Sequence, residues 1–394
     1  MTESADSFHV AIACGGTGGH LFPGLAVADE LQKHGCRISL LISPKDVDQQ
    51  AVKNVRDMKI VTLPAVGLQG RNYFAFARGF YRSYRTAKKI FNTDPPHAVL
   101  AMGGFTSAPP VLAGRSLGAK TFLHESNTIP GKANRWLSRF IDVAFIGFAQ
   151  TAARLSARKT VVTGTPVRPQ FRQRDTAECR TALGLEPNRP VVLVMGGSQG
   201  ANGINEMVLS ALPLLAIRAH HWQWLHLTGA NHAEKVTDAY AAAGVKAVVH
   251  TFLSEMELAL GAASASVSRA GASSLAEIAA MNLPSLLVPY PFAADDHQMH
   301  NARAFVDSGA ALLLEQKDAT PEKVCEALVK LVEDTAARQA MQIALAKWHE
   351  PKAAEKIADT ILDRVARSEA RKSSPLAQCS CGHAHHHKES KVIA

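Results

Sequence analysis

Short apolar runs alternate along most of the chain with stretches in which apolar residues recur every three or four positions. The short runs predict buried strands and the periodic stretches predict amphipathic helices. In the first half, strands are predicted at residues 8–14, 37–42, 59–63, 98–102, 120–123, 143–146 and 160–163. A helix is predicted at 21–34, where Leu21, Leu25, Ala28 and Leu31 have helical spacing. Strands that alternate with helices indicate a parallel sheet covered on both faces.

The alternation breaks at residues 164–169, where one glycine and two prolines cannot continue a helix or a central strand. It then restarts, with strands predicted at 190–195, 223–228, 247–250, 265–268, 285–289 and 310–314, helices at 272–281 and 297–307, and a helical pattern over 321–367. We therefore predict an α/β protein with two doubly wound, Rossmann-like domains that face a cleft, at 1–164 and 165–350. A helix at 351–367 is expected to pack back on the first domain, and the polar end, 368–394, is expected to be disordered.

Two glycine-rich turns follow predicted strands nearly half the chain apart. They read GGTGGH at 15–20 and GGSQG at 196–200. Glycine lets backbone amides approach a ligand closely, and a following helix N-terminus favours an anion. Neither turn completes the G-x-G-x-x-G dinucleotide motif or the Gly-Lys-Ser/Thr of a Walker loop. Either turn alone is also compatible with a purely structural role, but the pair indicates two phosphate-competent domains.

Composition narrows the classes of partner. The 394 residues carry a formal net charge of +9, which indicates an anionic partner such as a nucleotide, a nucleic acid or lipid headgroups. Only the charge favours a nucleic-acid-binding protein. No groove-reading or base-stacking module is recognisable, so no nucleic acid is expected as a partner. No apolar run is long enough for a membrane span, and the polar N-terminus is unlike a secretory signal. Cys14, Cys36, Cys179 and Cys325 are expected to be reduced.

Two segments have metal-binding character. Asp46-Val47-Asp48 fits a D-x-D pattern, but its polar neighbours favour a solvated turn or helix start, and so short a pattern is mostly chance. The tail carries the possible ligands Cys379, Cys381, His383, His385, His386 and His387. Their spacing is not that of a folded zinc module, so only weak, adventitious metal binding is expected. We expect no metal site and no required cofactor, and we expect removal of 368–394 to leave activity unchanged.

The segment 70–91 interleaves aromatic and cationic residues and contains no acidic residue. This composition suits a helix that lies on an anionic lipid surface. The alternative is an amphipathic helix that packs on the core and exposes a basic face. The residues expected to face the membrane are Tyr73, Phe74, Phe80, Arg82 and Arg85.

Further motifs identify a family resemblance. They are MGGFTS at 102–107, HESN at 124–127, GTPVR at 164–168, RAGASSLAE at 269–277 and PFAADDHQ at 291–298. In order and spacing, and together with the glycine turns, they resemble the GT-B glycosyltransferases of family 28 that act in bacterial peptidoglycan synthesis. The resemblance runs from about residue 8 to about residue 367. Composition and spacing alone lead only to a two-domain α/β enzyme for a phosphate-bearing ligand.

The resemblance implies a specific reaction. N-acetylglucosamine (GlcNAc) would move from UDP-GlcNAc to the 4-hydroxyl of the N-acetylmuramic acid (MurNAc) in undecaprenyl-pyrophosphoryl-MurNAc-pentapeptide, with inversion at the anomeric carbon. This converts lipid I to lipid II at the cytoplasmic face of the inner membrane. The resemblance also implies peripheral membrane attachment and leaves room for cell-wall synthesis partners there.

The resemblance also implies a donor-binding set: Thr17, Gly18, Gly19, Asn127, Arg168, Ser198, Leu253, Ala272, Ser273, Ser274, Leu275, Ala276, Glu277 and Gln298. Glu277 is expected to hold the ribose hydroxyls, since a carboxylate can accept two hydrogen bonds from a vicinal diol. A role of Glu277 as a mere complement to the helix dipole stays open at this stage. The amide of Gln298 is suited to the sugar hydroxyls.

The attacking hydroxyl needs a base. His20 is the first candidate, because an imidazole with a pKa near ~6.5 can accept a proton at neutral pH. Glu125 is the rival, and a purely structural His20 at the start of a helix is the third possibility. The small residues at 271–274 and Arg168 could stabilise the departing UDP without a metal.

Two other functions remain open from the sequence. One is a GT-B enzyme with a different lipid acceptor. The other is a UDP-GlcNAc 2-epimerase, which shares the two-domain plan. A transferase releases UDP only with its lipid acceptor, whereas an epimerase produces UDP-ManNAc without one.

Overall fold

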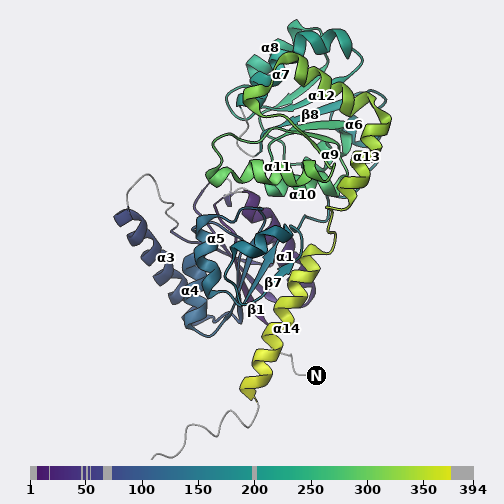
Figure 1. Cartoon of the computed structure of the whole chain (residues 1–394). Coiled ribbons are helices and arrows are strands. Elements are labelled where there is room, and N and C mark those ends of the chain that lie inside the picture. The colour runs from purple at the N-terminus through teal and green to yellow at the C-terminus, as the bar shows by residue number, and fades with distance from the viewer. Residues whose placement is uncertain are drawn as a thin grey trace, which may run out of the picture.

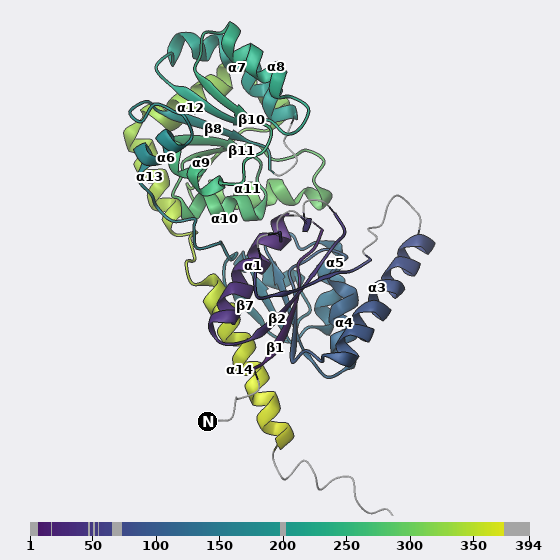
Figure 2. The ribbon, with the colours of Figure 1, turned by 180° about the vertical axis from the view of Figure 1, so that it is seen from behind.

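The computed structural model describes residues 7–16, 18–45, 48–49, 52–53, 55–64, 73–197 and 202–373. The chain forms two α/β domains stacked end to end, each built on one parallel sheet (Figure 1). This confirms the predicted fold class. Figure 2 shows the same arrangement from behind, with the helices on both sides of each sheet.

The first domain contains a seven-stranded sheet in the order β3-β2-β1-β4-β5-β6-β7. Its strands are β1 (His9–Ala13), β2 (Arg37–Ile42), β3 (Lys59–Thr62), β4 (Ala98–Ala101), β5 (Lys120–Glu125), β6 (Val143–Ile146) and β7 (Thr160–Val162). Its helices are α1 (Gly18–Lys33), α3 (Tyr73–Thr93), α4 (Ala108–Ser116) and α5 (Lys132–Leu137), with 3₁₀ turns η1 (Ser138–Phe140) and η2 (Ala149–Arg154). The central strands are buried throughout, as the continuous apolar runs predict.

The second domain contains a six-stranded sheet in the order β10-β9-β8-β11-β12-β13. Its strands are β8 (Val191–Met195), β9 (Gln223–Leu227), β10 (Ala247–His250), β11 (Ala265–Ser268), β12 (Ser285–Leu287) and β13 (Leu312–Leu313). Its helices are α6 (Thr176–Ala182), α7 (Asn202–Arg218), α8 (Ala233–Ala242), α9 (Met256–Ala262), α10 (Ala272–Ala280), α11 (His297–Asp307), α12 (Pro321–Glu333) and α13 (Thr335–Ala346). The 3₁₀ turns η3 (Ala294–Asp296) and η4 (Gln316–Asp318) complete it.

Every predicted strand is present, and the differences lie at the ends. The predicted strand at 310–314 shrinks to the two residues of β13. The helical pattern over 321–367 proves to be separate helices, and side chains cap the starts of α12 and α13. The Thr320 hydroxyl accepts a hydrogen bond from the Lys323 amide, and the Asp334 carboxylate accepts one from the Ala337 amide.

The last helix, α14 (Ala353–Ser373), returns to the first domain and lies along α1 (Figures 1 and 2). Its residues Ile357, Ile361 and Val365 are buried in the same core as Leu21 and Leu25. The helix continues beyond the predicted end at residue 367, so the segment predicted to be disordered begins with ordered helix. The Cys/His-rich end, 374–394, lies outside the described residues.

The predicted break at 164–169 is where the chain enters the second domain, and it returns close by. Gly164 has φ +74°, and a Cβ there would lie 2.7 Å from the Cβ of Glu350 on the returning segment. His124 at the end of β5 approaches the Gly164 carbonyl through Nε2, at 3.0 Å. Glycine at 164 therefore lets the two crossings pack against each other.

Candidate active site

The ends of the central strands of both sheets meet where the two domains touch. β1 leads into the first glycine turn, β4 into Gly103-Gly104, and β5 into Ser126-Asn127. From the second domain, β11 leads into the start of α10. The Ser273 hydroxyl, near the start of α10, donates a hydrogen bond of 2.9 Å to the Gly19 carbonyl of α1. The motifs predicted for the donor and the acceptor thus lie together at the domain interface.

The first glycine turn is held by Asp48, contrary to the interpretation of the Asp46–Asp48 pattern as solvated. The Asp48 carboxylate is fully buried, and its Oδ2 accepts a hydrogen bond of 2.6 Å from the Gly16 amide. It also accepts hydrogen bonds from the amide and hydroxyl of Ser43. Asp48 lies in a helical turn of the segment that follows β2, the neighbour of β1 in the sheet. These hydrogen bonds from Asp48 hold the first glycine turn against the segment after β2, and no local sequence pattern predicts them.

Gly15 is required by the same packing. A Cβ at Gly15 would lie 2.3 Å from the Ser43 backbone nitrogen, so no larger residue fits without movement of β2. On the other side, the Thr106 hydroxyl donates to the Gly15 carbonyl at 2.8 Å. The first glycine turn is therefore held in place by the segments that follow both neighbouring strands, β2 and β4.

His20 lies in the first turn of α1, against the turn that follows β4. A Cβ on Gly103 would lie 2.9 Å from His20 Nε2, and one on Gly104 would lie 3.4 Å from Nδ1. Burial lowers the pKa of His20 to about 4, while the negative charge of Asp48 opposes this shift. His20 is therefore neutral at pH 7, the state in which an imidazole can accept a proton.

Glu125, the rival base, is buried at the end of β5 and its carboxylate is heavily engaged. Oε1 accepts hydrogen bonds from the backbone and side-chain nitrogens of Asn127, at 2.9 and 3.0 Å. Oε2 accepts them from Asn134 Nδ2 at 2.7 Å and from the Gly131 amide at 3.2 Å. Burial raises the pKa of Glu125, and these hydrogen bonds oppose the rise. The carboxylate organises the loop that follows β5.

On the opposite side of the interface, α10 begins at Ala272. Its N-cap is Gly271, which has no side chain that could accept hydrogen bonds from the first amides of the helix. Glu277 is half-buried on this helix, and burial raises its pKa to about 7, while the charge of Arg168 opposes the rise.

Arg168 stacks its guanidinium 4.3 Å from the ring centre of Phe22 in α1. Its buried Nε has no hydrogen-bond partner. Arg168 thus links the domains through its stacking on Phe22.

The remaining predicted donor residues lie on several elements of both domains, and two of them are outside the described residues. The Gln298 carbonyl oxygen accepts a hydrogen bond of 2.9 Å from the Tyr290 amide, which fixes the orientation of its side-chain amide at the start of α11. Leu253 follows β10 and packs against the core of the second domain. Within α10, Ala272 and Leu275 are buried, and Ser274 and Ala276 are half-buried. Gly18 and Gly19 form the first positions of α1. Thr17 and Ser198 lie outside the described residues.

Sequence reasoning missed Asp48, Asn134 and Asn301. Asn301 lies one helical turn after Gln298 on α11, a spacing that places both amides on neighbouring positions of one helix face. That spacing could have identified it. Asn134 and Asp48 gave no such signal, because their contacts with Glu125 and Gly16 form only in the folded domain and follow no helical or strand spacing.

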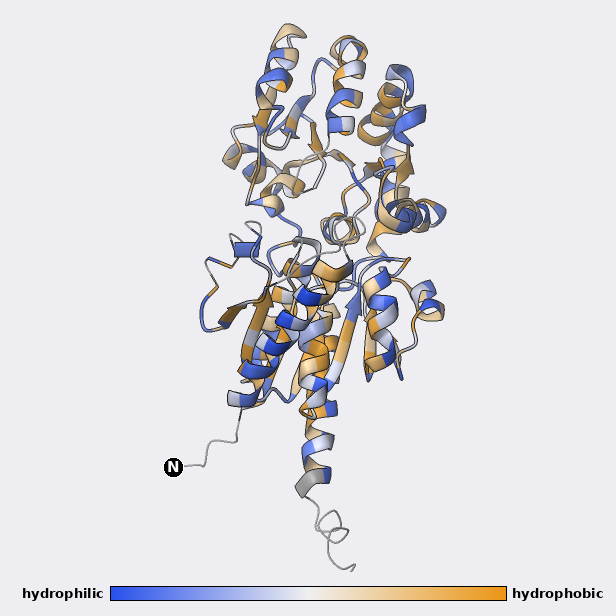
Figure 3. Cartoon of the chain, turned by 90° about the vertical axis from the view of Figure 1, so that its left-hand side faces the viewer, coloured by the Kyte–Doolittle hydropathy of each residue, from blue (hydrophilic) through white to orange (hydrophobic). Residues whose placement is uncertain are grey.

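The helix predicted at the membrane, α3, lies on the outside of the first domain (Figure 1). Tyr73, Phe74, Arg82 and Arg85 are exposed, and Phe74 is 80% exposed. Phe80 differs from the prediction: it is half-buried, and its ring packs 6.3 Å from Phe76 and 6.4 Å from Trp136. Figure 3 faces this side of the molecule and shows hydrophilic and hydrophobic residues mixed along its helices.

No helix in the described part of the chain combines the length and the apolar character needed to cross a membrane. No group of three or more His, Cys, Asp or Glu side chains among the described residues could hold a metal ion.

Comparisons with known proteins identify the family of this chain. Residues 10–146 match the glycosyltransferase family 28 N-terminal domain, and residues 191–360 match the glycosyltransferase family 28 C-terminal domain. A Synechocystis sp. protein is 37% identical over 374 residues, which cover 93% of this chain and all of that protein. The chain belongs to glycosyltransferase family 28.

Other family 28 relatives share this full-length similarity. A protein of Nitratidesulfovibrio vulgaris is 37% identical over 90% of this chain and 97% of its own length. Both relatives are named "UDP-N-acetylglucosamine--N-acetylmuramyl-(pentapeptide) pyrophosphoryl-undecaprenol N-acetylglucosamine transferase". The crystal structure of Acinetobacter baumannii MurG superposes with a TM-score of 0.71 at 29% identity, covering 90% of this chain and 99% of that chain. The two-domain architecture is the GT-B fold of this family.

Proposed function

We propose that this chain is the N-acetylglucosaminyltransferase that converts lipid I to lipid II in peptidoglycan synthesis. GlcNAc is transferred from UDP-GlcNAc to the 4-hydroxyl of MurNAc in undecaprenyl-pyrophosphoryl-MurNAc-pentapeptide. The observation that carries the proposal is the contact of α10 with the first glycine turn through Ser273 and Gly19. It brings Glu277 and the open helix N-terminus of one domain opposite His20 of the other. The family 28 relatives named above supply the identity of the substrates.

The donor is held by the second domain. The diphosphate lies at the N-terminus of α10, where peptide dipoles and unpaired amides favour an anion. Arg168 adds positive charge from the domain hinge, Glu277 accepts hydrogen bonds from the ribose hydroxyls, and the fixed amide of Gln298 binds GlcNAc. As UDP departs, these groups stabilise the negative charge that develops on its β-phosphate, so no metal is required.

The acceptor is activated by the first domain. Neutral His20 takes the proton of the MurNAc 4-hydroxyl as its oxygen attacks the anomeric carbon, and the electron pair of the broken bond leaves with UDP. Attack from the face opposite UDP inverts the anomeric configuration. The buried charge of Asp48 stabilises the imidazolium that forms. Glu125, with both oxygens engaged, positions the loop around Asn127 and Asn134 instead of acting as the base.

We further propose that the chain attaches peripherally to an anionic membrane surface, at the cytoplasmic face of the inner membrane. The exposed face of α3 supports this, because Phe74 and Tyr81 lie among Arg78, Arg82 and Arg85. The acceptor carries a lipid chain that stays in the membrane, so a basic and aromatic helix beside the first domain would place His20 near the surface. Other cell-wall synthesis proteins could dock at the same membrane.

The test is transfer of radiolabelled GlcNAc from UDP-GlcNAc to lipid-linked MurNAc-pentapeptide in detergent or vesicles. We expect UDP release only when the acceptor is present, no dependence on added divalent metal after chelation, and loss of transfer in Glu277→Ala. Formation of UDP-ManNAc without acceptor would instead establish an epimerase. Transfer to another glycolipid, but not to this acceptor, would establish a different transferase.

A further inference from the structure

The amide of Asn301 joins the two domains through a buried set of hydrogen bonds. Asn301 lies on α11 of the second domain and is completely buried. Its Oδ1 accepts hydrogen bonds from the Thr128 amide at 3.0 Å and from the Thr128 hydroxyl at 2.9 Å. Its Nδ2 donates to Asn127 Oδ1 at 3.0 Å and to the Ala270 carbonyl at 3.2 Å. An asparagine amide can donate two and accept two hydrogen bonds, so its capacity is fully used.

These hydrogen bonds continue into the acceptor half of the site. Asn127 donates through Nδ2 to Glu125, and the other oxygen of Glu125 accepts from Asn134. Asn134 Nδ2 lies 3.3 Å from the position that a Cβ on Gly103 would take, and His20 Nε2 lies 2.9 Å from the same point. Asn301 is therefore connected, through buried polar groups, to the surroundings of His20.

The same amide reaches the donor half. Ala270, its fourth partner, comes just before Gly271, the N-cap of α10. Rotation of one domain against the other would break the bonds to Asn127 and Thr128 but not the bond to Ala270, which lies in the same domain as Asn301. The Asn301 amide thus fixes the position of the start of α10 relative to the loop that follows β5.

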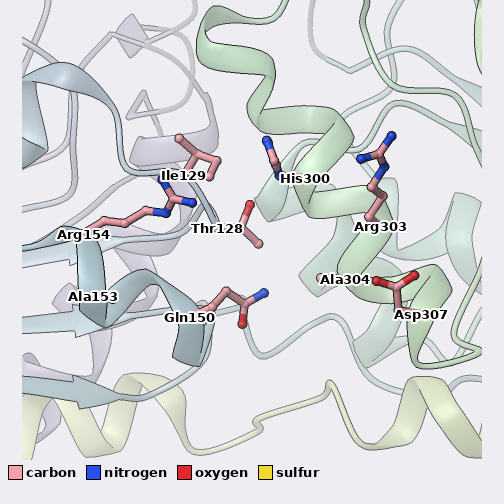
Figure 4. Close-up of a pocket in the computed structure, with 9 residues that line it drawn as sticks. All are labelled: Thr128, Ile129, Gln150, Ala153, Arg154, His300, Arg303, Ala304 and Asp307. Atoms are coloured by element: carbon pink, nitrogen blue, oxygen red, sulfur yellow. The ribbon is translucent and has the colours of Figure 1, made fainter.

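Helix α11 also connects this amide to the domain hinge. One turn after Asn301, Phe305 stacks on Trp348 of the returning segment at 4.5 Å between ring centres, and its ring lies 6.4 Å from that of Phe148 of the first domain. One turn before Asn301 is Gln298, at the predicted sugar site. Figure 4 shows Thr128 beside α11, between Gln150 and Arg154 of the first domain and His300 and Arg303 of the second, in a pocket of ≈ 600 Å³. The interface beside the Asn301 amide is therefore open to solvent.

We propose that Asn301 is a positioning residue that sets the closed arrangement of the domains and so aligns the donor with the base. It acts through Asn127, Thr128 and Ala270. The proposal deepens the transferase function proposed above and rests on it for its kinetic consequences. Three of the four bonds are buried and the bond to Asn127 is partly buried, so loss of an interdomain partner leaves a polar group of the interface unpaired.

The variants Asn301→Ala and Asn301→Asp test this inference. Asn301→Asp preserves shape but places an oxygen against Asn127 Oδ1 and the Ala270 carbonyl. We expect kcat to fall about tenfold or more in both variants, while UDP affinity stays within about threefold, because the donor domain alone binds the nucleotide. Tyr240→Phe is the matched control: it removes a buried hydrogen bond to His226 inside the second domain and should lower Tm without changing kcat.

Thr128→Val provides the second arm. It deletes the hydroxyl that donates to Asn301, and in the double variant with Asn301→Ala the losses in kcat should not multiply. Values of kcat within about twofold of wild type in folded Asn301→Asp would overturn the proposal, as would multiplicative losses. Amide hydrogen exchange at Thr128 is independent of activity. It should accelerate in Asn301→Ala, and unchanged exchange would refute the positioning role of Asn301, whether or not the proposed transferase function holds.

Discussion

The imidazole of His20 occupies the space where a side chain at Gly103 would project. A Cβ at residue 103 would lie 2.9 Å from His20 Nε2, and Gly103 also has φ +119°, which L-residues rarely adopt. The glycine pair in MGGFTS is thus explained by the histidine that it accommodates. A position far along the chain from the first glycine turn determines where the candidate base can lie.

Gly103→Ala should therefore displace His20 and lower kcat by about a hundredfold, since a base moved by roughly an ångström loses its alignment. Gly118→Ala is the matched control, because Gly118 also has positive φ (+88°) but its Cβ would meet nothing within 4 Å. Both variants should lose about 1 kcal/mol of stability from backbone strain, measured by denaturant unfolding. Equal kcat values for the two variants would argue against His20 as the base.

Glu277 should make stability depend on pH. Its pKa rises from 4.5 to about 7 on folding because burial disfavours the carboxylate. Below pH 4.5 the group is protonated in both states, so it has no effect. As pH rises toward 7 the unfolded chain ionises first, so the wild type should lose about 1 kcal/mol relative to Glu277→Gln, a value reduced for partial exposure. Unfolding of both proteins at pH 4.5 and pH 8 measures this difference.

The ribose role of Glu277 has a separate test in nucleotide affinity. Wild-type protein should bind UDP about tenfold more tightly than 2′-deoxy-UDP above pH 7, because an ionised carboxylate accepts from both ribose hydroxyls. Glu277→Gln should bind the two nucleotides almost equally. Strong discrimination by the Gln variant, measured by calorimetry, would assign the ribose to another residue.

The exposed cations of α3 should control attachment to membranes. Arg82→Glu with Arg85→Glu reverses two charges on the exposed face, and each basic residue contributes about 1 kcal/mol near an anionic surface. We expect co-sedimentation with vesicles that contain anionic lipid to be lost, while UDP-GlcNAc affinity is unchanged. Arg218→Glu with Arg338→Glu, in the second domain, is a control of equal charge. If both double variants lose vesicle binding equally, net charge rather than α3 is responsible.

Truncation separates the two parts of the C-terminal region. Removal of 374–394 should leave transfer and Tm unchanged, because α14 remains complete. Removal of 353–394 also deletes Ile357, Ile361 and Val365, which are buried against the first domain, and should cost several kcal/mol or prevent folding. Thermal unfolding of the two truncated chains decides between these outcomes. A chain ending before Ala353 that kept its Tm would show that α14 is dispensable.

Local patterns were sufficient for the fold because each buried strand carries its own apolar run. Residues such as Val191 to Met195 need no distant partner to be recognised as a central strand. The site was less accessible to the same reasoning. Asp48 seemed part of a polar turn, and its burial depends on the Gly16 amide of a neighbouring strand loop. Asn301 likewise acquires its partners only when the two domains meet.

Phe80 shows why the sequence could not predict which side chains of α3 are exposed. In the sequence it is one of several aromatics among cations, and nothing local distinguishes it from Phe74. Only the placement of α5, with Trp136 on it, turns Phe80 inward and leaves Phe74 outward. The interleaving of aromatic and cationic residues predicted a surface helix at α3, but which aromatic side chain turns inward depended on the neighbouring helix.

The return of α14 to α1 has a consequence for synthesis on the ribosome. The apolar side of α1 is covered by Ile357, Ile361 and Val365, which are made only after the entire second domain has been translated. The face of α1 that α14 covers therefore stays exposed while more than three hundred further residues are synthesised. The protein would most need a chaperone during this period, when the first domain has been synthesised but α14 has not.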